Sequence, residues 1–243
     1  WYNETGQVLQ SAPTPSTAVA RTLKYYVAQK FDTECEGPKA EIVVTINPLP
    51  AAPAVSATLA YCQNQTGVPE LNATATSGAT LVWYNGAGQV LPSAPTPSTA
   101  MVGTQTYYVS QKFSTGCEGP KAEIVVTINP LPAAPTVSDV TYCQNQTGIP
   151  ALTATKETIA VLVWYNETGQ ILPSAPTPST ATVGVQKYYV TQKFSKGCEG
   201  DKAEITVTIN PLPAAPTVSA TLAYCQNQTG VQPLTATKGN NAT

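Results

Sequence analysis

The same set of motifs recurs along this chain with a period of about 82 residues, and this recurrence limits the fold more than any other feature. The tryptophans show the period directly, because Trp1, Trp83 and Trp164 follow one another at almost equal separations. The segments that recur with them are WYN, SAPTPSTA, YYV, INPLPAAP and YCQNQTG. A fixed period of this length indicates an array of small, similar units, each the size of one domain.

The segment NPLPAAP marks the boundaries between repeats. Its prolines lack a backbone N–H and fix φ, so neither a strand nor a helix continues through it, and their spacing favours a semi-rigid polyproline connector. Complete repeats then cover residues 53–132 and 135–213, between a C-terminal half-repeat at 1–50 and an N-terminal half-repeat at 216–243. We expect these halves to be complementary, and to be completed by continuation of the chain or by a neighbouring copy of it.

Alternation of side chains with a period of two predicts β-strands and no helices. Ile124, Val126 and Ile128 share one face of a strand near the end of a repeat. Val125 points the other way and is replaced by Thr206 in the next repeat, which identifies the outer face. Several short strands separated by Gly, Pro, Asn and Ser clusters within one repeat predict an all-β fold of tandem antiparallel β-sandwich domains.

The strand LVWYN alternates in the same manner and places its tryptophan inside. Trp1, Trp83 and Trp164 are therefore the predicted core residues. Tyr84 and Tyr165 are predicted to face outward. There they would either stack on a sugar or, as is commoner, pack against a cross-strand neighbour.

The six cysteines occur at matching positions of the repeats and halves. The separation of Cys62 from Cys117 equals that of Cys143 from Cys198. With no second pair at CxxC spacing, this equality predicts one disulfide within each complete repeat rather than a metal site, and buried thiols are the alternative. The half-repeats contain Cys35 and Cys225. These two should bond to cysteines outside this chain, or to each other between neighbouring copies. Disulfides indicate an oxidising, extracellular compartment.

Composition excludes several classes of function. The chain has no histidine, which removes the commonest general base and metal ligand, and we expect no catalytic, cofactor-binding or metal-binding residues. Its net charge of −2 comes with scattered lysines, so it carries no electrostatic footprint for nucleic acid or anionic lipid. No apolar stretch approaches the length of a membrane-spanning helix, so membrane insertion is not expected.

Three further features have both a functional and a structural interpretation. The N-x-[ST] sequons would carry glycans in some secreted proteins, but we interpret them as turn residues. The SAPTPSTA segments are either contact loops or irregular edge connections, and the second is commoner. Acidic residues after the cysteines could bind Ca²⁺, although solvated turn residues fit their spacing better. The sequons are at Asn3, Asn64, Asn72, Asn145, Asn166, Asn227 and Asn241, and the acidic residues are Glu118, Glu199 and Asp201.

The order YC…LTAT…LVWY…YYV…GCEG…AEITVTINP resembles the immunoglobulin-like repeats of giant surface and secreted proteins of gliding Gram-negative bacteria. The resemblance covers both complete repeats and both halves, and it implies export, an immunoglobulin-like β-sandwich and a spacer or adhesive role. The pattern departs from antibody domains, because Cys117 lies well beyond Tyr108 and is predicted in the turn before the last strand. The disulfide need not lie beside the tryptophan.

Three functional classes follow from these features. A structural spacer in a filament, stalk or adhesin needs similar modules, short stiff connectors and covalent staples, all of which the sequence predicts. A multivalent adhesive module for surface glycans or proteins would need a binding surface on each repeat, and weak sites would then add through avidity. An enzyme would need a nucleophile with a base, or a pair of carboxylates in a cleft, and the repeated residues offer neither.

Overall fold

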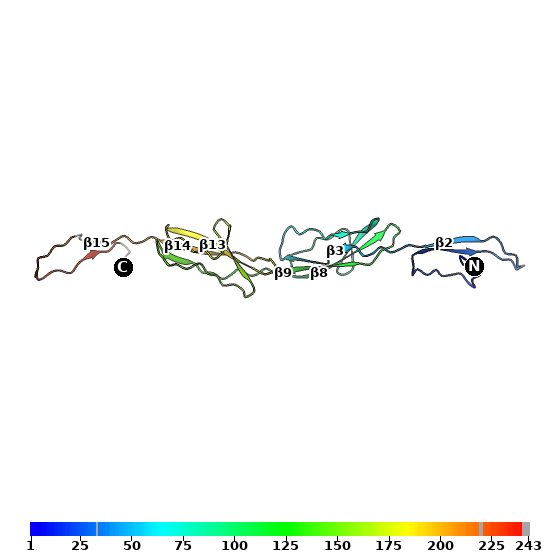
Figure 1. The fold of residues 1–243 in the computed structure, drawn as a ribbon, viewed down its shortest axis with the longest axis horizontal. Coiled ribbons are helices and arrows are strands. Elements are labelled where there is room, and N and C mark those ends of the chain that lie inside the picture. Colours follow the sequence, from blue (N-terminus) through cyan, green and yellow to red (C-terminus); the bar gives the residue numbers. More distant parts are fainter. Residues whose placement is uncertain (33, 219–220, 240–243) are drawn as a thin grey trace. The chain divides into compact units, whose positions relative to one another are not determined.

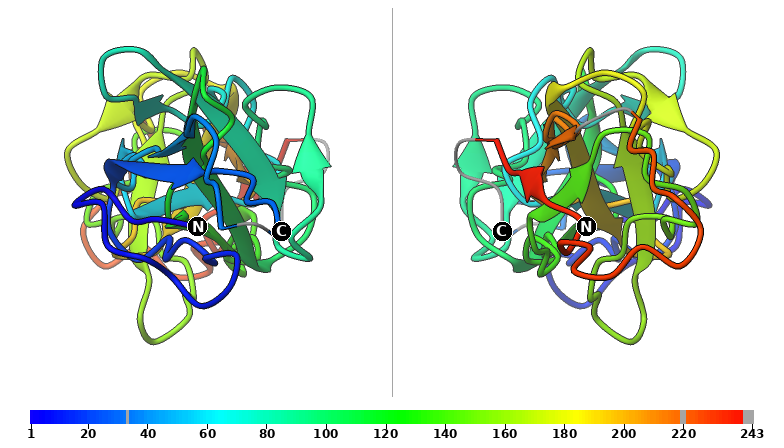
Figure 2. Two further views of the ribbon diagram at one scale, coloured as in Figure 1. Left: turned by 90° about the vertical axis from the view of Figure 1, so that its right-hand side faces the viewer. Right: turned by 90° about the vertical axis from the view of Figure 1, so that its left-hand side faces the viewer.

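The structure is a computed structural model, and it describes residues 1–32, 34–218 and 221–239. Both views in Figure 2 show arrows and connecting chain without a helical ribbon in this described part. The chain divides into two compact units, Trp1–Asn129 and Pro130–Thr243. The named elements of the described residues are all strands, so the predicted all-β class is confirmed.

Each complete repeat is built on a five-stranded sheet. In the first, the strand order is β4-β9-β8-β6-β7, and β8 and β9 run side by side (Figure 1). The second has the equivalent order β10-β14-β13-β11-β12. Aromatic and β-branched residues favour these strands because their side chains pack well on a pleated surface. The strands are β4 Thr58–Cys62, β6 Ala79–Asn85, β7 Val90–Leu91, β8 Gly103–Phe113, β9 Ala122–Asn129, β10 Val140–Cys143, β11 Val161–Tyr165, β12 Ile171–Leu172, β13 Gly184–Lys193 and β14 Ala203–Asn210.

The opposite layer of the sandwich is mostly irregular. In the first repeat it contains the short pair β3 (Ala54–Val55) and β5 (Ala73–Thr74). The second repeat has an isolated bridge between Thr136 and Thr155 at the equivalent place. The chain from 92 to 98 carries three prolines, which cannot donate to a ladder. It is instead held by isolated hydrogen bonds, such as the one from Leu71 N to the Pro95 carbonyl oxygen at 2.9 Å.

One strand pair differs from the predicted antiparallel sandwich. β4 pairs with β9 in parallel, from Thr58↔Val125 to Cys62↔Asn129, and β10 pairs with β14 in the same way. Almost the whole repeat separates the two strands of each pair, so no hairpin forces an antiparallel arrangement. The sheet is therefore mixed.

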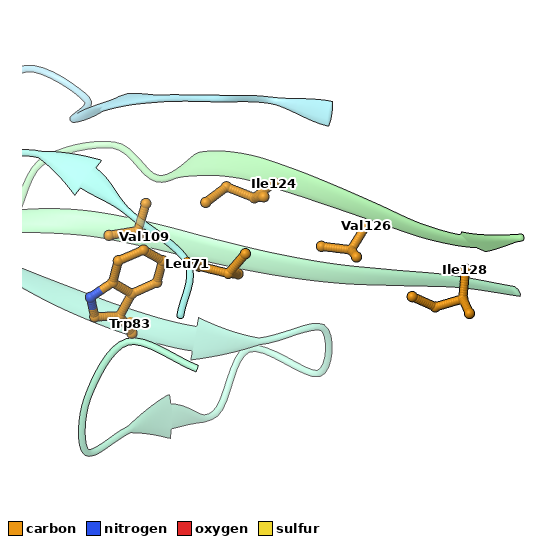
Figure 3. Close-up of a cluster of buried hydrophobic side chains, with 6 residues drawn as sticks. All are labelled: Leu71, Trp83, Val109, Ile124, Val126 and Ile128. Atoms are coloured by element: carbon orange, nitrogen blue, oxygen red, sulfur yellow. The ribbon is translucent and has the colours of Figure 1, made fainter. Parts of the chain in front are cut away.

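Each sheet packs one face on a core centred on the tryptophan. Leu71 and Val109 lie beside the Trp83 ring, and the isoleucines of β9 continue along the strand (Figure 3). Trp83 and Trp164 are only 6% and 5% exposed. The alternation expected of β9 and β14 is present, because every second residue is buried: Ile124, Val126, Ile128, Ile205, Val207 and Ile209.

The described residues before 51 and after 215 contain counterparts of some of these strands. β1 (Arg21–Val27) and β2 (Ala40–Ile46) pair antiparallel at the N-terminus, and β15 (Thr217–Val218) pairs with β16 (Ala236–Thr237) near the other end. Trp1 is 37% exposed, in contrast to its predicted core position, and Leu234 is 81% exposed where its counterpart Leu71 is buried. Residues 1–50 contain no counterpart of Leu71, which covers the ring of Trp83.

Candidate functional site

A buried glutamine in β8 fixes the proline-rich connector to the repeat that follows it. The side chain of Gln111 is fully buried, and its Nε2 donates to the Ala51 carbonyl oxygen at 2.7 Å and to Thr76 Oγ1 at 2.9 Å. Its Oε1 accepts from Thr76 N at 2.6 Å. Burial without these partners would carry a large desolvation cost, so the amide side chain specifies where the connector lies.

A glycine completes this docking by close backbone approach. A Cβ on Gly119 would lie 2.1 Å from the carbonyl oxygen of Pro50, which is itself buried. The backbone N of Gly119 donates to the Gln111 carbonyl oxygen at 2.9 Å, so the turn and β8 are joined at the same place. Since no side chain fits at this distance, glycine is required here by contact rather than by a left-handed φ.

The second repeat has the same arrangement. Gln192 Nε2 donates to the Ala133 carbonyl oxygen at 2.9 Å, and Gln192 Oε1 accepts from Glu157 N at 2.6 Å. A Cβ on Gly200 would again lie 2.1 Å from a proline oxygen, that of Pro132. We call this set the connector cradle: Gln111, Glu118 and Gly119 in the first repeat and Gln192, Glu199 and Gly200 in the second.

A carboxylate on the outer face holds the turn that carries the cradle glycine. Glu118 Oε1 accepts from the Tyr84 hydroxyl and from Ser110 Oγ, the latter at 2.5 Å. The hydrogen bond from Ser110, together with that from Tyr84, lowers the pKa of Glu118 below its ordinary value. Burial, followed by the bond to Glu118, raises the pKa of Tyr84. The turn is therefore tied to β6 and β8 through an ionised carboxylate and a neutral phenol.

Of the two interpretations of the outward tyrosines, packing against neighbours fits the structure and sugar stacking does not. Tyr84 and Tyr165 are only 6% and 8% exposed, although they do face away from the tryptophan core. Lys121 Nζ lies 3.3 Å from the centre of the Tyr84 ring, and Lys202 Nζ lies 4.3 Å from that of Tyr165. Their outer faces are therefore occupied by cations of the same repeat, and the sugar-stacking interpretation is wrong.

The cysteines differ from the pairing expected within each repeat. Cys62 and Cys198 are disulfide-bonded, whereas Cys117 and Cys143 are thiols. Neither the pair Cys62–Cys117 nor the pair Cys143–Cys198 is therefore formed. Cys225 is also a thiol and is exposed, and Cys35 is exposed as well. The equal spacing of the cysteines reflects the period of the repeat and not a bond.

The strand register explains why Cys62 and Cys117 are not bonded to each other. Cys62 pairs with Asn129, beside Ile128, which is opposite Gly103 at the start of β8. The Cys117 carbonyl oxygen accepts from Phe113 N, at the other end of β8 and in the predicted turn before the last strand. Ten residues of strand at ~3.3 Å each separate these ends by about 33 Å, whereas a disulfide needs Cα atoms within about 7 Å.

Several sequon asparagines act as turn residues, as we interpreted them. Asn64, Asn145 and Asn227 have φ of 57°, 60° and 66°, the left-handed region that asparagine tolerates. Asn166 Oδ1 accepts from Gln170 N at 2.8 Å and from Thr168 Oγ1 at 2.8 Å across a hairpin turn. Asn241 lies outside the described residues.

The SAPTPSTA segment is held as an edge connection. Thr99 Oγ1 donates to the Gln65 carbonyl oxygen at 2.9 Å, and the Thr99 carbonyl oxygen accepts from Asn64 N at 2.9 Å. Asp201, the third acidic residue considered for Ca²⁺, is exposed. Within residues 1–32, 34–218 and 221–239, no three His, Cys, Asp or Glu side chains gather as they would around a metal ion.

The cradle glutamines were missed from the sequence. The available signal was the recurrence of a glutamine after YYV in all copies, at Gln29, Gln111 and Gln192. A polar residue in a buried strand indicates a specific partner, but its partner on the connector lies 60 residues away in the first repeat. Sequence alone does not locate that partner.

The family described as "Ig-like domain CHU_C associated" matches residues 50–130 and 132–211, more than half of the chain. The chain belongs to this family. The CHU_C-associated Ig-like domain therefore accounts for both complete repeats, each of which begins with the connector residues that dock in its cradle. This match confirms the resemblance to bacterial immunoglobulin-like tandem repeats.

The chain is similar to several solved structures. Fibronectin(III)-like modules of Clostridium thermocellum CbhA are 16% identical, with 64% of this chain and 90% of that chain covered and a TM-score of 0.33. The titin I-band fragment I67–I69 is 8% identical, with 81% and 76% covered and a TM-score of 0.33. SGBP-B of the Bacteroides ovatus mixed-linkage glucan utilization locus, solved in complex with a mixed-linkage heptasaccharide, is 14% identical, with 84% and 57% covered and a TM-score of 0.23.

No curated protein matches the chain. In the part of the chain that the structure describes, no helix has the length and hydropathy needed to cross a membrane.

Proposed function

We propose that these CHU_C-associated Ig-like domains form a non-enzymatic spacer in an extracellular or cell-surface filament, stalk or adhesin. The observation that carries the proposal is the connector cradle, in which each complete repeat binds the backbone of the connector that precedes it. Disulfide-bonded Cys62 and Cys198 support an oxidising, extracellular location.

Docking of the connector gives a spacer its stiffness. A free polyproline segment is semi-rigid, but its ends still rotate relative to the domains they join. In the second repeat, Pro132 and Pro135 are buried and Ala133 is hydrogen-bonded to Gln192, so residues on both sides of Ala133 are held by that repeat. Only Pro130 and Leu131 remain between Asn129 of β9 and the docked segment, which leaves few rotatable bonds.

Removal of the cradle amides tests the proposal. The double variant Gln111→Ala/Gln192→Ala loses the bonds to Ala51 and Ala133 but keeps every connector proline. Small-angle X-ray scattering of the full chain should show a broader distribution of interatomic distances for this variant than for the wild type. Gln105→Ala/Gln186→Ala is the matched control, because these glutamines bond to Ser98 and Ser179 inside their own repeats. If the repeats of the cradle variant stay folded and its scattering profile is unchanged, the proposal is contradicted.

The alternative function, a multivalent adhesive module for glycans or proteins, has no observation in its favour. The aromatic side chains that suggested it, Tyr84 and Tyr165, contact glutamate and lysine of the same repeat. Binding of the full chain on a glycan array, retained in the cradle variant, would establish the alternative and replace the spacer role.

A further inference from the structure

The turn that precedes β2 is built like the turn of the connector cradle. The Tyr2 hydroxyl donates to Glu36 Oε1, and Lys39 Nζ lies 3.4 Å from the centre of the Tyr2 ring. The backbone N of Gly37 donates to the Gln29 carbonyl oxygen at 2.9 Å. Each of these contacts has its counterpart in the first repeat. The turn therefore holds the form that docks a connector.

Beside this turn lies a hollow of about 310 Å³, lined by the end of β1 and by the turn, with Gln29 and Gly37 among its residues. Gln29 is exposed, whereas its counterpart Gln111 is fully buried and bonded to the connector. A Cβ on Gly37 would meet only the Gln29 oxygen, at 3.6 Å, whereas one on Gly119 would meet the connector backbone at 2.1 Å. The hollow thus lies where the first repeat holds its connector.

The docked connector of the first repeat shows which chemistry fits such a hollow. Pro50 and Pro53 are buried, and the two alanines between them are exposed. The cradle contacts the backbone oxygens of Pro50 and Ala51 rather than a charged or long side chain. A proline-rich segment has fixed φ angles and loses little conformational entropy on binding. The matching ligand is a segment with the connector sequence Pro-Leu-Pro-Ala-Ala-Pro.

The chain itself carries an exposed segment of this sequence. INPLPAAP occurs three times, and its last copy covers residues 209–216. Pro213 and Pro216 are exposed there, whereas the equivalent Pro132 and Pro135 are buried. A second copy of the chain therefore presents the ligand that the hollow fits.

We propose that the hollow beside Gly37 binds a second copy of this chain through the connector at residues 211–216. Gly37 accommodates the backbone of Pro213, and Gln29 Nε2 donates to the Ala214 carbonyl oxygen. Because hollow and connector are different surfaces of one chain, association is head-to-tail and continues from copy to copy. The inference goes beyond the spacer role, and it holds whether or not the connectors within a chain are stiff.

Titration of the ¹⁵N-labelled full chain with the peptide Asn-Pro-Leu-Pro-Ala-Ala-Pro tests the site. We expect the largest amide shifts at residues 27–30 and 36–40. Gly37→Ala places a Cβ where the connector oxygen would lie and should weaken peptide binding at least about tenfold. Alanine is accommodated there without backbone strain, because Gly37 does not have a positive φ.

Thr22→Ala is the matched control, because Thr22 lies at the other end of β1 from the hollow. It should bind the peptide as the wild type does. Peptide shifts confined to other parts of the chain, or unchanged binding in Gly37→Ala, would overturn the site.

Sedimentation velocity over a range of concentrations tests the occupant, with thiols alkylated so that no disulfide forms between copies. The wild type should associate as its concentration rises, and either the peptide or Gly37→Ala should return it to monomers. Pro213→Ser/Pro216→Ser should also prevent association while keeping its affinity for the peptide. A wild type that is monomeric at every concentration, or association that Gly37→Ala leaves unchanged, would overturn a second copy as the occupant.

Discussion

Gly119 and Gly37 occupy equivalent positions in successive repeats but have different surroundings. A Cβ on Gly119 would lie 2.1 Å from the Pro50 oxygen, whereas a Cβ on Gly37 would meet only the Gln29 oxygen at 3.6 Å. Neither glycine has a positive φ. Comparing the same substitution at both glycines therefore shows what contact with the connector contributes, apart from the other properties of the CEG turn.

Gly119→Ala should displace the connector from its cradle. The backbone oxygen of Pro50 cannot move without breaking the neighbouring bond from Gln111 to Ala51. We expect a loss of about 1–3 kcal/mol in the stability of the first repeat, the usual cost of overpacking a close contact. Gly37→Ala is the control and should change stability by less than about 0.5 kcal/mol. Equal effects of the two substitutions in thermal unfolding would show that connector contact is not the reason for the glycine.

The Glu118 carboxylate should make the first repeat sensitive to acid. Its folded-state pKa is lowered from 4.5, mainly by the bonds from Ser110 and Tyr84. The stabilisation is therefore present above pH 4.5 and is lost as the pH falls through the lower, folded-state value. Hydrogen-exchange protection factors at residues 110–121, which correct for the intrinsic pH dependence of amide exchange, should be lower below this range than above it. Glu118→Gln should flatten that dependence, and an equally steep profile in this variant would assign the acid sensitivity to another group.

At the scale of strands, the tryptophan of β6 holds the two layers together. Trp83→Ala should destabilise the first repeat by about 3–5 kcal/mol, because it removes a large buried aromatic side chain from beside Leu71 and Val109. Peptide-resolved hydrogen exchange should show the loss in β8 and β9, while β13 and β14 keep their protection. Trp1→Ala, at a half-exposed site, should have little effect. A loss below about 1 kcal/mol at Trp83 would contradict the assignment of this core.

The sequence predicted those features that depend only on residues close together in the chain. Alternation in β9 identified Ile124 and Val126 as inward residues, and the prolines of NPLPAAP identified where strands stop. The parallel pairing of β4 with β9 was not predictable, because a five-residue strand carries no signal for the direction of a partner almost a whole repeat away. The prediction of the cysteine pairing was wrong for a related reason. Residue spacing does not show at which end of a strand a residue lies, and only the register does.

The site was predicted in part. The glycine in CEG and the connector prolines were visible as separate motifs, but their contact depends on tertiary structure. The buried position of Gln111 was not predicted, because a glutamine within a strand usually faces solvent and its partner on the connector is distant in sequence. Tyr84 was correctly placed opposite the tryptophan, but its covering by Glu118 and Lys121 comes from a turn 34 residues later and could not be read from alternation.

For the whole molecule, the connector prolines should limit motion between repeats. Replacing Pro130, Pro132 and Pro135 with serine removes three fixed φ angles and two buried rings. Backbone ¹⁵N relaxation should then show greater fast mobility at residues 131–134. Pro130→Ser alone, at an exposed position outside the cradle, should have a smaller effect. Unchanged relaxation in the triple variant would show that the cradle alone fixes the connector.

The parallel pairing of β4 and β9 has a mechanical consequence for a protein pulled at its ends. Tension arriving from the preceding connector reaches β4 at Thr58, and tension from the next one reaches β9 at Asn129. These points are at opposite ends of two strands that run in the same direction, so the strands are drawn past each other. Their evenly spaced hydrogen bonds are loaded together in shear, whereas a hairpin pulled from one end opens bond by bond. Each repeat would therefore resist stretching more strongly than its small core suggests.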